Sequence, residues 1–177
     1  EGITHITETD FKYAKAMHMG IKLLGTSRRK EGGLFALVAP MMVAEDHPLY
    51  SVNDVFNAIL VKGNALGDVM FYGKGAGELP TASACVADVM ECLQASPRRE
   101  EIGWAADPTG FVDPAQLRTR YYFRIEGSLT DAAMAFGQVE VLSEDGETAF
   151  LTDAISGQDA ADQSQRLNVL ACMRVLA

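Results

Sequence analysis

The first part of the chain alternates apolar segments with helix-capping and turn signals. Thr7 followed by Asp10 three residues later has the spacing of a capping box and predicts that a helix begins there. Apolar residues over 21–27 and 34–43 predict two strands. The polar and glycine-rich segment 28–33 between them predicts a turn.

The next segment predicts a short helix followed by a hairpin. Ser51 with Asp54 has capping spacing for a helix whose apolar face carries Val52, Val55, Phe56 and Ile59. Apolar runs over 59–62 and 69–72 flank Gly63-Asn64, which is a hairpin-type turn signal.

A cluster of glycines follows this hairpin at positions 73, 75 and 77. A helix opened by Pro80 and Thr81 comes next, because proline is favoured in the first helical turn. One stripe of this helix is apolar and carries Val86, Val89, Met90 and Leu93.

The second part of the chain has the pattern of a small β-α-β-β-α-β domain. A segment rich in proline and charge, residues 96–117, is predicted to be a linker. The elements after it are predicted at 121–125 (strand), 130–136 (helix), 139–142 and 149–152 (strands), from Ser156 through 167 (helix) and 173–176 (strand). The predicted fold class is therefore α+β, with a mixed sheet and helices on one face, followed by this small domain.

Composition excludes several classes of function. The chain has 177 residues, of which 48% are hydrophobic and 22% charged, and its net charge is −9. An acidic protein of this kind is a poor match for a nucleic-acid binder or a polybasic membrane anchor. The longest apolar run, residues 34–44, is shorter than the roughly 20 residues that a membrane helix needs. No nucleic-acid partner and no membrane partner are expected.

The cysteines and histidines show no catalytic or metal-binding pattern. Cys85 and Cys92 lie seven residues apart, beyond disulfide reach along a helix, and we expect buried, inert thiols in a reducing cytoplasm. Apart from the weak run Glu45-Asp46-His47, none of the three histidines has a partner at a metal-ligand spacing. We therefore predict no catalytic residue and no metal site in this chain.

The glycine cluster is the sharpest chemical feature. It lies between a predicted strand and a predicted helix, where main-chain N–H groups can approach a phosphate or a flat ring without an intervening Cβ. The spacing Gly73-x-Gly75-x-Gly77 does not match a dinucleotide-binding fingerprint, because Glu78 stands where the third glycine is required. The residues alone leave two interpretations open: a ligand-facing bend, or a tight strand-to-helix turn.

Three motifs in family order resemble the middle of homoserine dehydrogenases. The first covers Glu1-Gly2-Ile3 to Ile21-Lys22-Leu23-Leu24-Gly25, and the second covers His47-Pro48-Leu49 to Val55-Phe56-Asn57-Ala58. The closest match is Met70-Phe71-Tyr72-Gly73-Lys74-Gly75-Ala76-Gly77-Glu78-Leu79-Pro80-Thr81-Ala82-Ser83-Ala84. Residues 119–177 are similar to the C-terminal ACT domain of bacterial members, although Ser128-Leu129-Thr130-Asp131 replaces the usual Pro-Gly.

The resemblance implies an oxidoreductase that interconverts L-homoserine and L-aspartate 4-semialdehyde with NADP or NAD, in threonine and methionine biosynthesis. It also implies three segments: a partial substrate and dimerisation domain over 1–95, a linker over 96–117 and an ACT-like domain over 118–177. In the family the glycine turn closes over the nicotinamide end of the cofactor. Gly77 is the best match for that contact, followed by Gly75 and Thr81.

The chain begins with Glu1 rather than methionine, so we expect a C-terminal fragment of such an enzyme. The Rossmann glycines, the catalytic lysine and the substrate-binding carboxylates of the family lie upstream of the position that matches Glu1. The chain alone is therefore expected to be inactive and to bind no cofactor. The intact enzyme is expected to bind a small-molecule substrate and to form a homo-oligomer, most simply a dimer. The alternative function is an ACT-type module for amino-acid binding, regulation or dimerisation.

Overall fold

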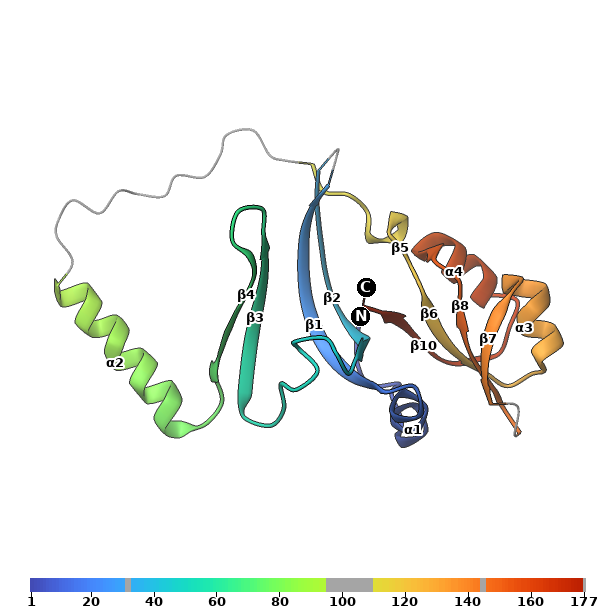
Figure 1. Cartoon of the computed structure of the whole chain (residues 1–177), viewed down its shortest axis with the longest axis horizontal. Coiled ribbons are helices and arrows are strands. Elements are labelled where there is room, and N and C mark those ends of the chain that lie inside the picture. The colour runs from blue at the N-terminus through green and yellow to red at the C-terminus, as the bar shows by residue number, and fades with distance from the viewer. Residues whose placement is uncertain (31–32, 95–109, 144–145, 177) are drawn as a thin grey trace. The chain divides into compact units, whose positions relative to one another are not determined.

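The computed structural model describes residues 1–30, 33–94, 110–143 and 146–176. The chain forms two compact units, one of residues 1–45 with 109–177 and one of residues 46–108. Figure 1 shows the elements of each unit. Within the described residues, no helix is long and apolar enough to cross a membrane.

The first unit is built on a six-stranded mixed sheet in the order β1-β2-β10-β6-β8-β7. Its long hairpin consists of β1 (Met19–Lys30) and β2 (Gly33–Ala44), paired from Met19↔Ala44 to Lys30↔Gly33. The other strands are β6 (Tyr121–Ile125), β7 (Val139–Ser143), β8 (Thr148–Thr152) and β10 (Val169–Val175). Two short strands, β5 (Arg118–Thr119) and β9 (Ile155–Ser156), pair separately.

The helices of this unit begin at capping residues. Helix α1 (Glu8–Ala16) has the predicted capping box of Thr7 and Asp10. Helices α3 (Leu129–Phe136) and α4 (Gly157–Ser164) begin with the same arrangement, Ser128 with Asp131 and Ser156 with Asp159. A 3-10 turn, η1 (Pro114–Gln116), precedes β5. Apart from the two-residue strand β9, the elements from β6 to β10 thus follow the order β-α-β-β-α-β.

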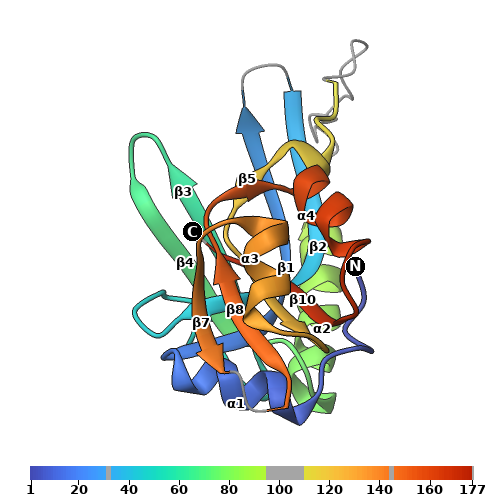
Figure 2. The same cartoon turned by 90° about the vertical axis from the view of Figure 1, so that its right-hand side faces the viewer.

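Strand β10 joins the long hairpin to the rest of the sheet. It pairs in parallel with β2, with Arg174 opposite Met41, and antiparallel with β6. The α+β class with a mixed sheet is confirmed, but the prediction of helices on one face is wrong for this sheet. Because the strands merge into one sheet, α1 packs on one face and α3 and α4 pack on the other (Figure 2).

The two faces carry two apolar cores because side chains alternate along each strand. On the α1 face, Tyr122 and Met173 pack with Ala14 of α1. On the opposite face, Phe123 and Phe150 pack with Ala132 of α3 and with Ala160 of α4. Strand β6 is buried along its whole length, which fits the apolar run Tyr-Tyr-Phe-Arg-Ile.

One charged side chain interrupts that run. Arg124 is buried in β6 and donates from Nε to Asp10 Oδ1 at 2.9 Å and from Nη1 to Glu147 Oε2 at 2.8 Å. Tyr122 donates to the same Asp10 oxygen at 3.0 Å. This network, which the sequence analysis did not foresee, connects the first turn of α1 to the sheet.

The second unit contains a hairpin and a helix. Strands β3 (Phe56–Gly63) and β4 (Gly67–Lys74) pair from Phe56↔Lys74 to Gly63↔Gly67, which confirms the predicted hairpin. Helix α2 (Glu78–Gln94) follows. It carries Cys85 and Cys92, which are exposed rather than buried as expected.

Two local predictions are wrong. The short helix expected after Ser51 does not form: the backbone makes turns there, Asp54 has φ +56°, and Phe56 already begins β3. The turn expected over 28–33 is wrong for residues 28–30 and 33, because β1 continues through Lys30 and β2 begins at Gly33. Most of the predicted linker 96–117 lies outside the described residues. The division into segments 1–95, 96–117 and 118–177 stays a prediction.

Candidate functional site

The glycine cluster forms the bend between β4 and α2. Gly73 is still paired in β4, opposite Asn57 of β3, and Gly77 directly precedes the first residue of α2. All three glycines of the bend are exposed to solvent. A short stretch of main chain with few side chains therefore lies at the surface of the second unit.

The bend is held against the start of β3 by main-chain hydrogen bonds. The N–H of Gly75 donates to the carbonyl of Val55 at 3.2 Å, and the N–H of Ala76 donates to the same oxygen at 3.4 Å. A Cβ at position 75 would lie 1.7 Å from Nδ2 of Asn57. Glycine is therefore required here by the neighbouring side chain, whatever the bend binds.

Gly77 has a conformation that favours glycine for a different reason. Its φ is +113°, where a side chain is strained. The hydroxyl of Thr81 donates to the Gly77 carbonyl at 2.8 Å, and the Thr81 N–H donates to the same oxygen at 3.2 Å. The Thr81 hydroxyl therefore holds the Gly77 carbonyl in place. Because its proton is used in this bond, the hydroxyl can only accept a hydrogen bond from another group.

The three predicted site residues thus come together in one corner of the second unit. Gly75, Gly77 and Thr81 all lie between the end of β4 and the first turn of α2, and each is exposed. The sequence did not indicate that Val55 is part of this site. Its carbonyl accepts the hydrogen bonds from the bend, and any residue at position 55 would supply the same main-chain oxygen. Asn57 was quoted only as part of a motif, not as the side chain that fills the space beside Gly75.

Aromatic and cationic side chains brace the strands that carry the bend. The rings of Phe56 and Tyr72 stack with centroids 4.8 Å apart and 7° between their planes. Lys74 places Nζ 5.9 Å from the centroid of Phe56. These contacts secure the open end of the hairpin, where the bend begins.

Helix α2 presents an apolar surface to solvent. None of its residues is buried. The predicted stripe is largely exposed, with exposed fractions of 62% for Val86, 58% for Val89, 49% for Met90 and 78% for Leu93. Exposed apolar patches of this kind mark interaction surfaces.

His47 serves the chain turn before the hairpin. Its Nδ1 accepts a hydrogen bond from the N–H of Leu49 at 3.2 Å. Burial and the nearby charge of Lys62 lower the pKa of His47, which favours the neutral ring that can accept this bond. Within the described ranges, no group of three or more His, Cys, Asp or Glu side chains is placed to hold a metal.

Comparison with known proteins gives one consistent family. The homoserine dehydrogenase family matches residues 1–90. The homoserine dehydrogenase of Lactococcus lactis subsp. lactis (strain IL1403) is 36% identical over 132 residues, which cover 71% of this chain and 30% of that protein. The enzyme of Neisseria gonorrhoeae (strain ATCC 700825 / FA 1090) is 42% identical over 150 residues, which cover 80% of this chain and 34% of that protein.

A solved structure agrees over nearly the whole chain. The homoserine dehydrogenase of Thiobacillus denitrificans superposes with a TM-score of 0.81 at 28% identity, covering 99% of this chain and 47% of that one. The chain therefore spans less than half the length of the proteins that it matches. The matched motifs and the superposed fold agree, and the chain belongs to the homoserine dehydrogenase family.

Proposed function

We propose that this chain is the C-terminal part of a homoserine dehydrogenase, in which the bend between β4 and α2 lies against the nicotinamide end of NAD or NADP. The reaction is the reversible reduction of L-aspartate 4-semialdehyde to L-homoserine, a step toward threonine and methionine in the cytoplasm. The observation that supports this is the exposed, glycine-rich main chain at residues 73–77, which leads directly into α2.

The residues of the bend fit a flat ring. A Cβ at position 73 would meet no atom within 4 Å, so the space beside this residue is open. Gly77 is exposed and carries no side chain that would separate a ring from the backbone. When bound, the nicotinamide supplies the hydride chemistry. Gly75 and Gly77 would form the surface under it, and Thr81 would hold the Gly77 carbonyl in place.

We also propose that the 177-residue chain alone does not oxidise homoserine and binds no cofactor by itself. Members of the family are matched over less than half of their length. By resemblance, their Rossmann glycines and catalytic lysine lie upstream of the position of Glu1. The bend contributes positioning only, since it carries neither a hydride acceptor nor an acid.

A fusion tests whether the chain can complete a homoserine dehydrogenase and whether the chain alone is inactive. The chain is joined to the upstream part of the Lactococcus lactis relative, and homoserine-dependent reduction of NAD and NADP is measured for the fusion and for the chain alone. We expect turnover by the fusion only. Turnover by the chain alone would refute its proposed inactivity.

Two glycine substitutions in the fusion test the bend itself. Gly77→Ala should raise the KM for the cofactor about tenfold, a change of roughly 1.4 kcal/mol. Gly67→Ala is the matched control, because Gly67 also has a positive φ, +72°, but is the first residue of β4, at the end of the strand away from the bend. Equal effects of the two substitutions on the cofactor KM would show that the bend has no special role.

A second candidate function rests on the order of β6, α3, β7, β8, α4 and β10. We infer that these elements form an ACT-like domain that binds an amino acid or regulates the enzyme. Ser128 and Asp131 cap α3 where the resemblance leads us to expect Pro-Gly. A calorimetric titration with threonine distinguishes the cases: saturable heat supports a regulatory module, and a flat response at millimolar threonine leaves a structural role.

A further inference from the structure

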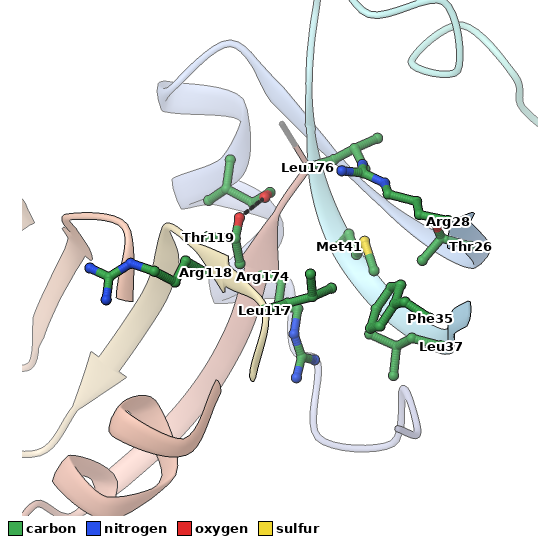
Figure 3. A pocket seen from close by; sticks show the side chains of 11 residues that line it. Thr26, Arg28, Phe35, Leu37, Met41, Leu117, Arg118, Thr119, Arg174 and Leu176 are labelled. Carbon is green, nitrogen blue, oxygen red and sulfur yellow. Dashed lines mark hydrogen bonds between the residues drawn. The ribbon is translucent and has the colours of Figure 1, made fainter. Parts of the chain in front are cut away.

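The cavity in the first unit does not bring two cations together. It has a volume of about 80 Å³ and lies where the β1–β2 hairpin, β10 and the segment entering β5 meet (Figure 3). Arg174 already donates to both carboxylate oxygens of Glu1, and the guanidinium of Arg28 lies at the opposite end of the cavity. Phe35 and Met41 line it and are almost completely buried. The glycine bend of the second unit offers more open chemistry.

The amide of Asn57 lies beside this bend. Asn57 belongs to β3 and is paired with Gly73 of β4. A Cβ built on Gly75 would meet Nδ2 and Cγ of Asn57 before any other atom. The amide therefore occupies the space that a side chain at position 75 would need, next to the main chain of the bend.

Strand pairing leaves another side of this amide open. Side chains of directly paired residues lie on the same face of a sheet, so residue 73 would supply the nearest cross-strand neighbour of Asn57. Residue 73 is glycine, and a Cβ there would meet no atom within 4 Å. Asn57 is itself exposed to solvent. The amide thus borders an open space next to glycine main chain.

The fold gives no reason for an asparagine at position 57. Asparagine is disfavoured in strands, and the next pair on the same face, Ile59 with Phe71, is apolar. In the part of the chain that the structure describes, the Asn57 amide has no hydrogen-bond partner. Its donors and its acceptor are therefore available to another molecule. A residue that breaks a local preference without a structural gain is expected at a functional site.

The nearest cation of the hairpin lies on the other face. Lys74 is paired with Phe56, one position along from the pair of Asn57, and successive side chains of a strand alternate between the two faces. Nζ of Lys74 lies 5.9 Å from the centroid of the Phe56 ring, which keeps the charge on that face. The face that carries Asn57 therefore presents a neutral polar group at the bend.

We propose that Asn57 recognises the carboxamide group of the nicotinamide and thereby sets the orientation of the ring at the bend. This inference rests on the proposed function. A primary amide has two N–H donors and one carbonyl acceptor, and the carboxamide of nicotinamide has the same set, so each group can donate to the other. Asn57 itself transfers neither a proton nor a hydride.

A neutral amide also suits a reaction that runs in both directions. The nicotinamide ring carries a positive charge when it is oxidised and is neutral when it is reduced. A carboxylate at position 57 would favour the oxidised ring by charge attraction. The Asn57 amide has the same shape but no charge, so it can bind both forms of the cofactor.

The test measures cofactor binding by calorimetry, without homoserine, in the fusion with the upstream part of the Lactococcus lactis relative. The probes are NAD, NADP and their 3-acetylpyridine analogues, in which a methyl group replaces the NH2 of the carboxamide. The fusion should bind the analogue about three- to tenfold more weakly than the cofactor, as expected for a lost hydrogen bond. Asn57→Ala should remove most of this difference by weakening the binding of the cofactor itself.

Two controls separate recognition from folding. ADP-ribose, or its phosphorylated form where NADP is the cofactor, lacks the nicotinamide and should bind equally to the wild-type and Asn57→Ala fusions. A general loss of structure would weaken its binding as well. Asn64→Ala removes an exposed asparagine from the turn that follows β3, and it should leave every affinity unchanged.

Asn57→Asp is a second variant, and it keeps the size and shape of the side chain if Asn57→Ala fails to fold. It should weaken the binding of the reduced cofactor relative to the oxidised cofactor several-fold, because only the oxidised ring attracts the new charge. A merely structural role of Asn57 would leave this ratio unchanged.

Three results would overturn the inference: the same preference for cofactor over analogue in Asn57→Ala as in wild type, equal effects of Asn57→Ala and Asn64→Ala, or an unchanged ratio of oxidised to reduced binding in Asn57→Asp. If Gly77→Ala still weakens cofactor binding in that case, the bend binds the cofactor and only the role of Asn57 is wrong. A fusion that binds neither NAD nor NADP would refute the proposed function and this inference together.

Discussion

Arg124 Nε lies 2.9 Å from Asp10 Oδ1, and 114 residues of chain separate these two buried side chains. The same carboxylate caps its own helix by accepting from the N–H of Thr7 at 2.8 Å. One acidic residue thus stabilises the start of α1 and also neutralises the only charge within β6. Removing one partner of such a buried pair strongly destabilises the folded protein, because the other charge stays buried without compensation.

Asp10→Asn should therefore destabilise the protein by about 3–5 kcal/mol, because Arg124 would remain buried with its main counter-charge gone. Urea unfolding followed by circular dichroism measures this change. The matched control is Glu140→Gln, which removes the exposed partner of Arg120, 2.6 Å away, and should cost less than about 1 kcal/mol. Equal losses for the two variants would show that the buried pair contributes no more than a surface pair.

The same pair predicts how stability depends on pH. Burial raises the pKa of Asp10, but hydrogen bonds from Arg124, Thr7 and Tyr122 outweigh burial and leave the pKa below its usual value. The contribution of Asp10 to the free energy of unfolding is complete above the pKa that its carboxyl group has in the unfolded chain, about 3.9. This contribution is lost as the pH falls through the lower pKa of the folded state.

We therefore expect the stability gap between wild type and Asp10→Asn to narrow below about pH 4, because the protonated aspartic acid then resembles asparagine. Urea unfolding at pH 6, 4 and 3 measures the gap. A gap that stays constant over this range would contradict a lowered pKa for Asp10.

Gly75 offers a prediction about the bend. Gly75→Ala places a Cβ 1.7 Å from Asn57 Nδ2, so the Asn57 side chain must move, at a cost of about 1–3 kcal/mol. Asn57→Ala in the same molecule should restore most of the loss, and hydrogen exchange of residues 56–81 measures local stability. Gly73→Ala is the control, because its Cβ would meet nothing within 4 Å. A double variant no more stable than Gly75→Ala would rule out this clash as the cause.

Local signals explain what the sequence predicted well. The hairpin around Gly63-Asn64, the capping boxes at Thr7 and Ser156, and strand β6 each depend on residues within a few positions of one another. The position of the glycine bend between a strand and a helix was also predictable, because glycine and the following Pro80 are local signals.

Long-range contacts explain what the sequence did not predict. The pairing of Met41 with Arg174 depends on main-chain groups of two strands far apart in the chain, and no side-chain pattern specifies it. The partner of Arg124 was hidden because Asp10 already had a sufficient local role as a helix cap. Capping spacing at Ser51 was misleading, because Phe56 and Ile59 are committed to pairing within the hairpin.

The apolar stripe of α2 predicts self-association, in keeping with the homodimer expected from the family resemblance. With Val86, Val89 and Leu93 more than half exposed, the chain should associate as its concentration rises, and light scattering measures the mean mass. Val89→Lys with Leu93→Lys should shift the protein toward monomer. Ala84→Lys adds a charge to the opposite face of the same exposed helix, where it should leave the mean mass unchanged. A chain that stays monomeric at high concentration, or equal effects of both changes, would exclude this stripe as the association surface.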